Sequence, residues 1–185
     1  MIGTTRDDAA GEAFDKIGRV IGLPYPGGAA LDKLAYEGDS KAIKLPSPAL
    51  SGDTLDFSFS GLKTAALNYI NTTRQSGGEV NRADLAASYT AAIVDAVAKK
   101  ADAALVKTGH RRLVLAGGVA ANSHLRQKLA EVAKRRGVTL SVPPISLCGD
   151  NGAMVACAGF YEYQLGRFAD TSLNASAEDP VSYEV

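Results

Sequence analysis

The sequence has few cysteines and no excess of either charge, and each of these features excludes a class of protein. Only Cys148 and Cys157 are present, too few for a disulfide framework, so we expect reduced thiols in a cytoplasmic protein. Twenty basic and twenty acidic residues give a formal net charge of zero, so no global positive field holds nucleic acid non-specifically. Any RNA contact must therefore come from local basic patches or from partner proteins.

Long apolar runs are absent as well. No run approaches the roughly 20 residues that a membrane-spanning helix requires. The opening residues MIGTTRDDAAGEAFD lack the basic and then apolar layout of a signal peptide. The 185 residues are 46% hydrophobic and 22% charged, which is typical of a globular protein with a buried core. We therefore predict a cytoplasmic protein with no membrane association.

Residue sets typical of hydrolases are also missing. The sequence offers no Ser/His/Asp or Cys/His set, and it lacks the HExxH motif of zinc proteases. His110 and His124 lie far apart among basic residues, so we interpret both as surface histidines. Cys148 has no Cys or His at zinc-ligand spacing. We find no protein nucleophile and assign no catalytic residue.

Apolar periodicity predicts an α/β protein. We expect helices at 7–21, 29–36, 61–73, 82–107, 120–136 and 150–165. We expect short strands at 56–60, 113–116 and 138–142, and an irregular surface loop over 38–55. The strand–helix–strand–helix order late in the chain indicates an α/β layer structure. Two or three strands are too few for a full α/β sheet, so the chain resembles the second half of a larger fold.

A two-glycine turn between a strand and a helix is the first candidate binding feature. The residues LVLAGGVAAN at 113–122 run from an apolar strand through Gly117-Gly118 to a helix start. Glycine lets the backbone approach a ligand closely, and a helix amino terminus attracts anions. Asn122, near that helix start, could bind a base, ribose or phosphate. A plain tight turn is the other interpretation, because the segment is neither a P-loop nor a GxGxxG motif.

Three carboxylates form the second candidate. Asp8, Glu12 and Asp15 fall at i, i+4 and i+7, so we predict that they share one face of the 7–21 helix. Such a face could meet ribose hydroxyls or a hydrated metal, although carboxylates near a helix start are also favourable for dipole reasons alone. Asp15 lies two turns into the helix, where the dipole effect fades, and is the better candidate.

Two further loops carry candidate residues. The Tyr25-Pro26-Gly27-Gly28 loop, followed by Asp32, either presents backbone N–H groups to a ligand or simply links two helices. Asp150 lies where the last helix is predicted to begin, so it either caps that helix or ligates a metal.

Other segments have two interpretations each. The alternating DFSFSGLK segment at 56–63 is either a substrate loop or a contribution of Phe57 and Phe59 to the core. The basic groups at 99–100, 111–112 and 134–136 are either solvated helix ends or contacts for RNA or a partner.

Taken in order, five segments resemble the bacterial TsaD family, also called Gcp, of tRNA threonylcarbamoyladenosine transferases. The segments are DDAAGEAFDK, GLPYPGG, DFSFSGLKT, LAGGVAANSHLR and CGDNGAM, spread over residues 7–154. No single segment is decisive, but five in this order are highly specific. The resemblance implies the two-lobed α/β fold of actin, heat-shock-70 chaperones and sugar kinases, with a nucleotide bound between the lobes.

The resemblance also implies a reaction and its site. Asp15, Gly28, Asp32 and Asn122 would contact an adenine nucleotide or threonylcarbamoyl-AMP, and Asp150 would ligate one divalent metal, iron or zinc in relatives. The implied reaction transfers threonylcarbamoyl to N6 of adenosine 37 in ANN-decoding tRNAs. The implied partners are tRNA, a TsaB-like paralogue and a TsaE-like ATPase.

The family's first lobe, with its phosphate loop, HxxxH motif and Ser-Gly-Gly-His loop, is not in this sequence. We therefore expect a C-terminal portion covering a little over half of the family's length. Residues 1–147 would be part of the second lobe, 148–170 a helix returning to the first lobe, and 171–185 a polar tail. The isolated chain is expected to be inactive and to bind metal poorly through Asp150 alone. The apolar side chains expected to pack on the first lobe are Met154, Val155, Ala158 and Phe160.

Other functions stay open from the residues. A different actin-like ATPase, such as a sugar kinase or carbamoyltransferase, would share the strand–Gly-Gly–helix element. An inert scaffold subunit is a non-enzyme alternative, and a metalloendopeptidase ranks last. The preferred assignment requires that the loops at 26–32 and 117–122 converge with Asp15 on one wall of a cleft.

Overall fold

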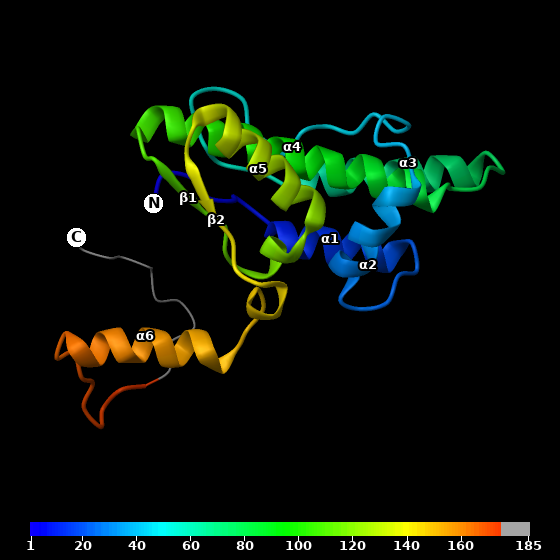
Figure 1. Ribbon diagram of the computed structural model, residues 1–185. Coiled ribbons are helices and arrows are strands. Elements are labelled where there is room, and N and C mark those ends of the chain that lie inside the picture. The colour runs from blue at the N-terminus through cyan, green and yellow to red at the C-terminus, as the bar shows by residue number, and fades with distance from the viewer. Residues whose placement is uncertain (175–185) are drawn as a thin grey trace. The chain divides into compact units, whose positions relative to one another are not determined.

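Helices dominate the structure, a computed structural model that describes residues 1–174. The chain divides into a first unit, Met1–Gly149, and a second unit that begins at Asp150. In the first unit the elements are α1 (Ala10–Val20), α2 (Gly27–Leu34), η1 (Ala35–Glu37), α3 (Ser60–Gln75), α4 (Arg82–Thr108), β1 (Arg112–Val114), η2 (Gly118–Ala121), α5 (Ser123–Arg136), β2 (Thr139–Ser141) and η3 (Ile145–Leu147), where η marks a 3-10 helix (Figure 1). The second unit holds α6 (Gly152–Gln164).

The long helix α4 is the central element of the first unit. Asn81 caps its start by accepting from the N–H groups of Ala83 and Asp84, and Gly109 ends it in a left-handed conformation with φ 69°. Tyr89, near its middle, is fully buried and donates its hydroxyl to the Ala13 carbonyl of α1 at 3.2 Å. Burial raises the pKa of the Tyr89 hydroxyl well above its ordinary value. The predicted helix at 82–107 is confirmed.

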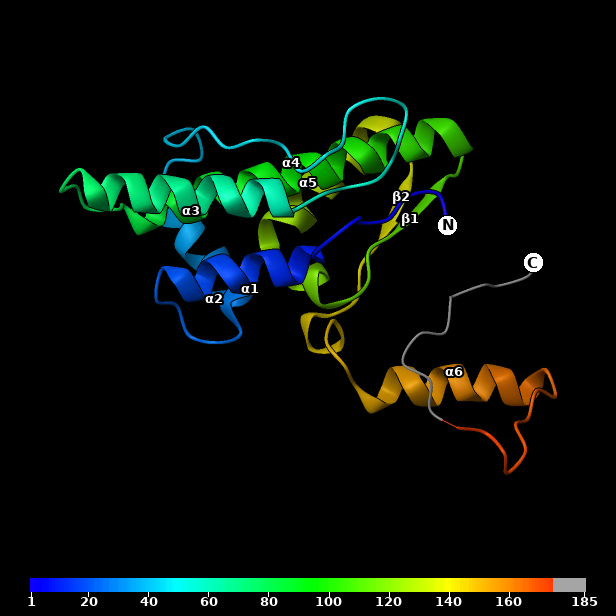
Figure 2. The same cartoon turned by 180° about the vertical axis from the view of Figure 1, so that it is seen from behind.

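The main core lies where α1, α2 and α3 pack on the first half of α4. Figures 1 and 2 show α1 and α2 side by side next to α4. Phe14 of α1 meets the Tyr89 ring edge to face, with ring centroids 6.2 Å apart. The core's largest fully buried side chains include Ile17, Leu31, Phe59, Leu62, Ile70 and Leu85. The apolar residues whose spacing predicted these helices are therefore the residues that pack in this core.

A second core joins α4 to α5 and a small sheet. β1 and β2 pair in parallel, with Leu113 opposite Leu140. These two leucines pack on a cluster from the two helices that includes Val94, Leu105, Leu125 and Leu129. The strand–helix–strand order gives a parallel pair because the chain must cross over through α5 to return in the same direction. The predicted α/β class is confirmed.

The strand predicted at 56–60 is wrong. Only Phe57 makes isolated bridges, to Thr5 and Ala49, and Ser60 already begins α3. The Phe59 and Ser60 N–H groups donate to the Asp7 carboxylate, so they are not available to a strand ladder. The other interpretation of this segment, packing of Phe57 and Phe59, is confirmed, since their rings stack with centroids 5.7 Å apart and Phe59 is buried.

Several helix starts differ from the predicted ones. α1 begins at Ala10 rather than residue 7, so Asp8 lies before the helix and does not share a helical face with Glu12 and Asp15. The helix predicted at 120–136 divides into η2 and α5, with Asn122 as the cap of α5. α2 begins two residues earlier than expected, at Gly27.

The second unit contains the predicted C-terminal helix. Its N-cap is Asn151, whose side chain accepts from the Met154 N–H at 2.9 Å, so Asp150 is not the cap that its residue type suggested. No residue of α6 is buried. Among the described residues, no helix combines the length and apolarity that crossing a membrane requires. Most of the predicted polar tail, from 175 onward, lies outside the described residues.

Candidate functional site

Asp15 and Gly28 meet where α1 crosses the start of α2. The Gly28 N–H donates to Asp15 Oδ1 at 2.9 Å. The two helices can approach because glycines face each other at the crossing: a Cβ on Gly27 would lie 3.3 Å from the Cα atoms of both Asp15 and Gly18. The glycines of the Pro26-Gly27-Gly28 loop therefore have a packing function that brings the Asp15 carboxylate to the start of α2.

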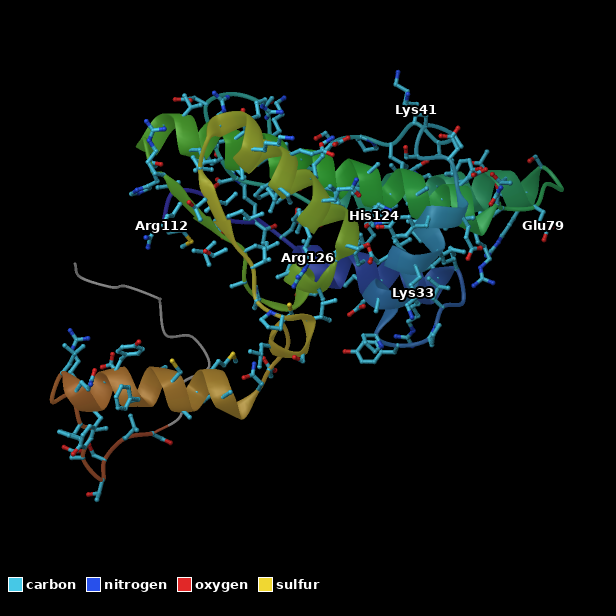
Figure 3. The ribbon with its side chains drawn as sticks, viewed as in Figure 1. Lys33, Lys41, Glu79, Arg112, His124 and Arg126 are labelled. Carbon is cyan, nitrogen blue, oxygen red and sulfur yellow. The ribbon has the colours of Figure 1, made fainter. Side chains whose placement is uncertain are left out.

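Asp32 joins the other end of α2 to the start of α5. Its two carboxylate oxygens accept from the Ser123 N–H at 3.2 and 3.1 Å, and Oδ2 also accepts from the Ser123 hydroxyl at 2.7 Å. His124 Nδ1 lies 2.8 Å from Asp32 Oδ1, and the His124 ring stacks on Tyr36 with centroids 4.1 Å apart (Figure 3). His124 is thus half-buried and held on both sides, and its interpretation as a plain surface histidine is wrong.

Helix α2 connects these two contacts. Gly28 and Asp32 are four residues apart in α2, so they lie on the same face of that helix, one turn from each other. Asp15 therefore contacts one end of this face and the start of α5 contacts the other. Asn122, the residue before Ser123, is buried and caps α5 through its side-chain oxygen, which accepts from the Leu125 N–H at 2.8 Å. The structure brings the four predicted residues onto three adjoining elements.

The two-glycine turn lies against α1. Gly117 has φ 87°, in the region that favours glycine, and η2 follows directly. A Cβ on Gly11 of α1 would lie 3.4 Å from Val119 Cγ2, so the two segments are in van der Waals contact. The 26–32 segment thus contacts Asp15 through Gly28, and the 117–122 turn contacts α1 at Gly11 through Val119. Convergence of both loops with Asp15 on one wall of a cleft stays a prediction.

A cavity of about 590 Å³ opens beside Asp15. It lies between α1 and the loop that leads to α2, and its lining residues are Glu12, Asp15, Lys16, Arg19, Leu23, Pro24, Tyr25 and Gly27. The lining combines carboxylates, cations and an aromatic ring, which suits a polar ligand with hydroxyl and anionic groups. Asp32 and Asn122 do not line it, so of the four predicted residues this cavity contains only Asp15.

Asp7, an acidic residue that sequence reasoning did not assign, holds part of the site's framework together. Asp7 accepts from the Phe59 N–H at 2.7 Å and from the Ser58 hydroxyl, so it caps α3 from far away in the sequence. The Ser58 hydroxyl and the backbone N–H groups hold the pKa of Asp7 below its ordinary value. No local pattern reveals such a cap, because its partners lie about fifty residues away.

Asp8 binds two lysines. Its oxygens lie 2.6 Å from Lys16 Nζ and 3.2 Å from Lys63 Nζ, which ties α1 to α3. Lys16, and then Lys63, hold the pKa of the Asp8 carboxyl below its ordinary value. Because Lys16 is also paired with Glu12 at 3.1 Å, these carboxylates are already neutralised by protein cations. Asp15 is the carboxylate of this group with no lysine or arginine in ion-pair contact among the described residues.

Arg126 was also missed, and it links the glycine turn to the segment before Asp150. Its Nε donates to the Ala120 carbonyl of η2 at 2.5 Å. Its Nη2 donates to the Pro143 carbonyl at 2.7 Å and to the Cys148 sulfur at 3.1 Å. Cys148 is buried, so this guanidinium fixes the loop after β2 against η2 (Figure 3). The only sequence signal for Arg126 was its position as the last residue of the LAGGVAANSHLR segment.

The metal predicted at Asp150 was tested against the residues present. Asp150 is exposed, and the described part of the chain has no group of three or more His, Cys, Asp or Glu side chains placed to hold a metal ion. A transition metal or zinc in a protein needs about four ligands, or three and a water. These residues alone do not fit a metal site, and we route no chemical step through a metal.

The comparisons with known proteins agree with one another. The family described as tRNA N6-adenosine threonylcarbamoyltransferase, TsaD, matches residues 1–157. A protein of that name from Moorella thermoacetica is 51% identical over 182 residues, covering 98% of this chain and 53% of the relative. Relatives of the same name from Clostridium botulinum (strain 657) and Clostridioides difficile (strain 630) are 48% and 49% identical, each covering 95% of this chain and 52% of the relative.

The chain thus spans about half the length of the curated relatives it matches. Among solved structures, the crystal structure of HypF from T. kodakarensis aligns with a TM-score of 0.58 and 22% identity, covering 86% of this chain and 20% of that one. At that identity the likeness supports the fold alone. The family match extends over all four predicted binding residues and Asp150. The chain belongs to the TsaD family of tRNA N6-adenosine threonylcarbamoyltransferases.

Proposed function

We propose that the protein containing this chain transfers the threonylcarbamoyl group of threonylcarbamoyl-AMP to N6 of adenosine 37 in ANN-decoding tRNAs. The observation that carries the proposal is the α2 connection: Asp15 bonds Gly28 at one end, and Asp32 bonds the start of α5 at the other. In a chain of this family, we take these bonds as support for Asp15, Gly28 and Asp32 as nucleotide contacts. No observation favours a sugar kinase, a scaffold subunit or a peptidase.

The reaction is a single acyl transfer. The N6 amine attacks the carbamoyl carbon, a C–N bond forms, the bond from that carbon to the phosphate oxygen breaks, and AMP leaves with the electron pair. The amine gives up one proton. We assign no protein nucleophile for a covalent intermediate, so positioning of the two substrates and stabilisation of charge would supply the rate.

Asp15 is the strongest candidate for ligand contact. It lines the cavity, it is half-buried, and its carboxylate accepts one backbone hydrogen bond, so further acceptor sites are available to ribose hydroxyls. Asp32 differs, because both of its oxygens already accept from Ser123 and one also contacts His124. We propose that a ligand reaches Asp32 by replacing the Ser123 hydroxyl, whose rotation would also break its 2.8 Å hydrogen bond with the Tyr36 hydroxyl.

Asn122 and Gly28 would act through position. Asn122 uses its oxygen as the α5 cap, so its amide nitrogen is the group available for a ligand. Gly28 carries no side chain at the point where α2 begins beside Asp15, which leaves its backbone accessible to a nucleotide.

The remaining assignments are also part of the proposal. We propose Asp150 as one ligand of a divalent metal, iron or zinc, which would require further ligands from elsewhere in the protein. The proposed partners are tRNA, a TsaB-like paralogue and a TsaE-like ATPase, in the cytoplasm. The isolated 185-residue chain is proposed to be inactive.

The test uses the full-length protein with its partner proteins, threonylcarbamoyl-AMP carrying labelled threonine, and an ANN-decoding tRNA transcript. Label should enter the tRNA only when adenosine 37 is present. Asp15→Asn should raise the KM for the adenylate by roughly 10- to 100-fold, since a hydrogen bond to a charged group contributes about 1.5–3 kcal/mol. Asp53→Asn changes an exposed loop aspartate outside the cavity and is the matched control, which should leave the KM for the adenylate unchanged. Absence of label transfer by the wild type would overturn the proposal.

A further inference from the structure

The ends of α4 and α5 lie together at one edge of the first unit. α4 ends at Gly109 and α5 ends at Gly137, and each glycine turns the chain into a strand. The two strands are parallel and begin side by side, with Arg112 opposite Thr139. The Thr139 N–H also donates to the Arg111 carbonyl at 2.9 Å. Residues that follow both helices are therefore neighbours in space (Figure 1).

This edge concentrates positive charge in a chain whose formal net charge is zero. We call it the basic edge and define it by six cationic side chains: Lys107, Arg111, Arg112, Lys134, Arg135 and Arg136. All six residues are exposed. The two helices bring them together from sequence positions far enough apart that the sequence shows only two separate basic groups.

Few carboxylates neutralise the basic edge. Asp102 pairs with Arg135 at 3.1 Å and with Arg136 at 2.6 Å, and Asp53 lies 4.0 Å from Lys107. Among the described residues, no carboxylate lies within ion-pair distance of Arg111, Arg112 or Lys134. The surface therefore keeps a local excess of positive charge after its internal pairs are formed.

Helix ends alone do not account for this excess. Cations in the last turn of a helix interact favourably with its dipole, and this explains Lys107, Lys134, Arg135 and Arg136 in part. The effect falls off beyond that turn. Arg111 follows the end of α4, and Arg112 lies in β1, so neither gains from the dipole in this way. A shallow hollow of about 180 Å³ lies among His110, Arg111 and Arg136, which gives the edge a concave spot with two guanidinium groups.

We propose that the basic edge is a docking surface for the phosphate backbone of the tRNA substrate. Guanidinium groups bind phosphate through two parallel hydrogen bonds, and phosphate contacts supply most of the sequence-independent affinity for nucleic acid. An acidic protein surface is less suitable, because protein interfaces have an apolar centre depleted of charge, whereas all six cationic residues of the basic edge are exposed and three of them have no carboxylate within ion-pair distance among the described residues. This inference rests on the proposed function, which supplies the tRNA, and adds where its backbone binds.

The experiment uses the full-length protein and measures tRNA affinity against salt concentration. Arg111→Gln, Arg112→Gln and Lys134→Gln are combined, because these three cations have no carboxylate within ion-pair distance in the described part of the chain and their loss leaves the Asp102 pairs intact. Three lost phosphate contacts should reduce the slope of log K against log salt by about 2 to 3. If the two lines meet near 1 M salt, affinity at 0.1 M falls on the order of 100-fold. The kcat at saturating tRNA should not change.

Two further variants keep the result interpretable. Lys41, which Figure 3 labels, Lys44 and Arg74 are exposed cations that do not belong to the basic edge, and changing them together to Gln should leave the slope unaltered. Arg111→Lys, Arg112→Lys and Lys134→Arg together keep the charge and should keep the slope.

Each outcome is decisive for one of the two proposals. A wild-type enzyme that modifies tRNA, beside a folded Gln variant with an unchanged salt slope and KM for tRNA, overturns the docking surface. If the Gln variant instead loses only its binding to a partner protein, the edge is a protein interface and the inference is wrong. A wild type that modifies no tRNA refutes the proposed function itself.

Discussion

Gly27→Ala tests whether the close crossing of α1 and α2 positions the site. Gly27 does not have a left-handed φ, so alanine is permitted by the backbone. Its new Cβ would lie 3.3 Å from the Cα atoms of Asp15 and Gly18, both on the α1 backbone, which cannot rotate away. The two helices must therefore separate by a few tenths of an ångström, and the bond from Gly28 to Asp15 lengthens.

The size of the effect follows from two opposing terms. Overpacking of this kind costs about 1–3 kcal/mol. Replacing glycine by alanine also restricts the unfolded chain, which raises the free energy of unfolding by about 0.4–1 kcal/mol. We expect Gly27→Ala to lower the free energy of unfolding by about 1–2 kcal/mol. We also expect about tenfold weaker adenylate binding, because the displaced element carries Gly28 and Asp32.

Urea denaturation of the chain gives the first quantity, and calorimetric titration of the full-length protein with a non-hydrolysable adenylate gives the second. Gly61→Ala is the matched control: nothing lies within 4 Å of its Cβ, so this variant should be as stable as the wild type or more stable. The reasoning is refuted if Gly27→Ala unfolds at the same urea concentration as the wild type and binds the adenylate equally well.

Two other substitutions test contacts outside the site. Lys100 is buried and donates to the carbonyls of Leu50 and Thr54, so Lys100→Met should cost about 1–3 kcal/mol in the free energy of unfolding and speed hydrogen exchange in the 49–55 loop. Lys99→Met, an exposed neighbour, should leave both unchanged. Arg136, with Arg135, lowers the pKa of Asp102 to about 2, so the carboxylate stabilises the fold above its unfolded pKa near 3.8. Asp102→Asn should therefore cost about 1 kcal/mol near neutral pH. That difference should shrink as the pH falls from about 4 toward 2, and a constant difference across that range would contradict the assignment.

Elements with strong local signals were predictable from the sequence. The helix at 82–107 was placed to within one residue at its C-terminal end from its apolar period, and in the structure the Asn81 cap and Gly109 agree with that period. The strands predicted at 113–116 and 138–142 are also present, because their apolar runs are strong local signals. Each strand is only three residues long in the structure. Their pairing in parallel follows from the helix between them.

Contacts that depend on tertiary structure were not predictable. The start of α1 was misplaced because Asp7 and Asp8, good helix-capping residues, are used instead by α3 and by two lysines. The strand at 56–60 failed for the same reason, since the Asp7 carboxylate takes the N–H groups that a strand partner would need. The Asp7 carboxylate, which binds groups about fifty residues away, thus contributes to both errors, the start of α1 and the strand at 56–60. Neither the alternation of apolar residues nor the presence of cap residues in the sequence can reveal such a contact.

The position of His124 shows why family resemblance and local chemistry had to be combined. Its residue type among basic neighbours suggested solvent exposure, yet Asp32 binds its ring nitrogen and Tyr36 stacks on its face. Asp32 was selected by resemblance as a ligand contact, and the structure places it in bonds that hold the start of α5. A residue can have both functions if its protein bonds are the ones a ligand displaces. Binding at Asp32 would then release the Ser123 hydroxyl, while the Ser123 N–H, which also donates to both Asp32 oxygens, would keep the start of α5 on α2.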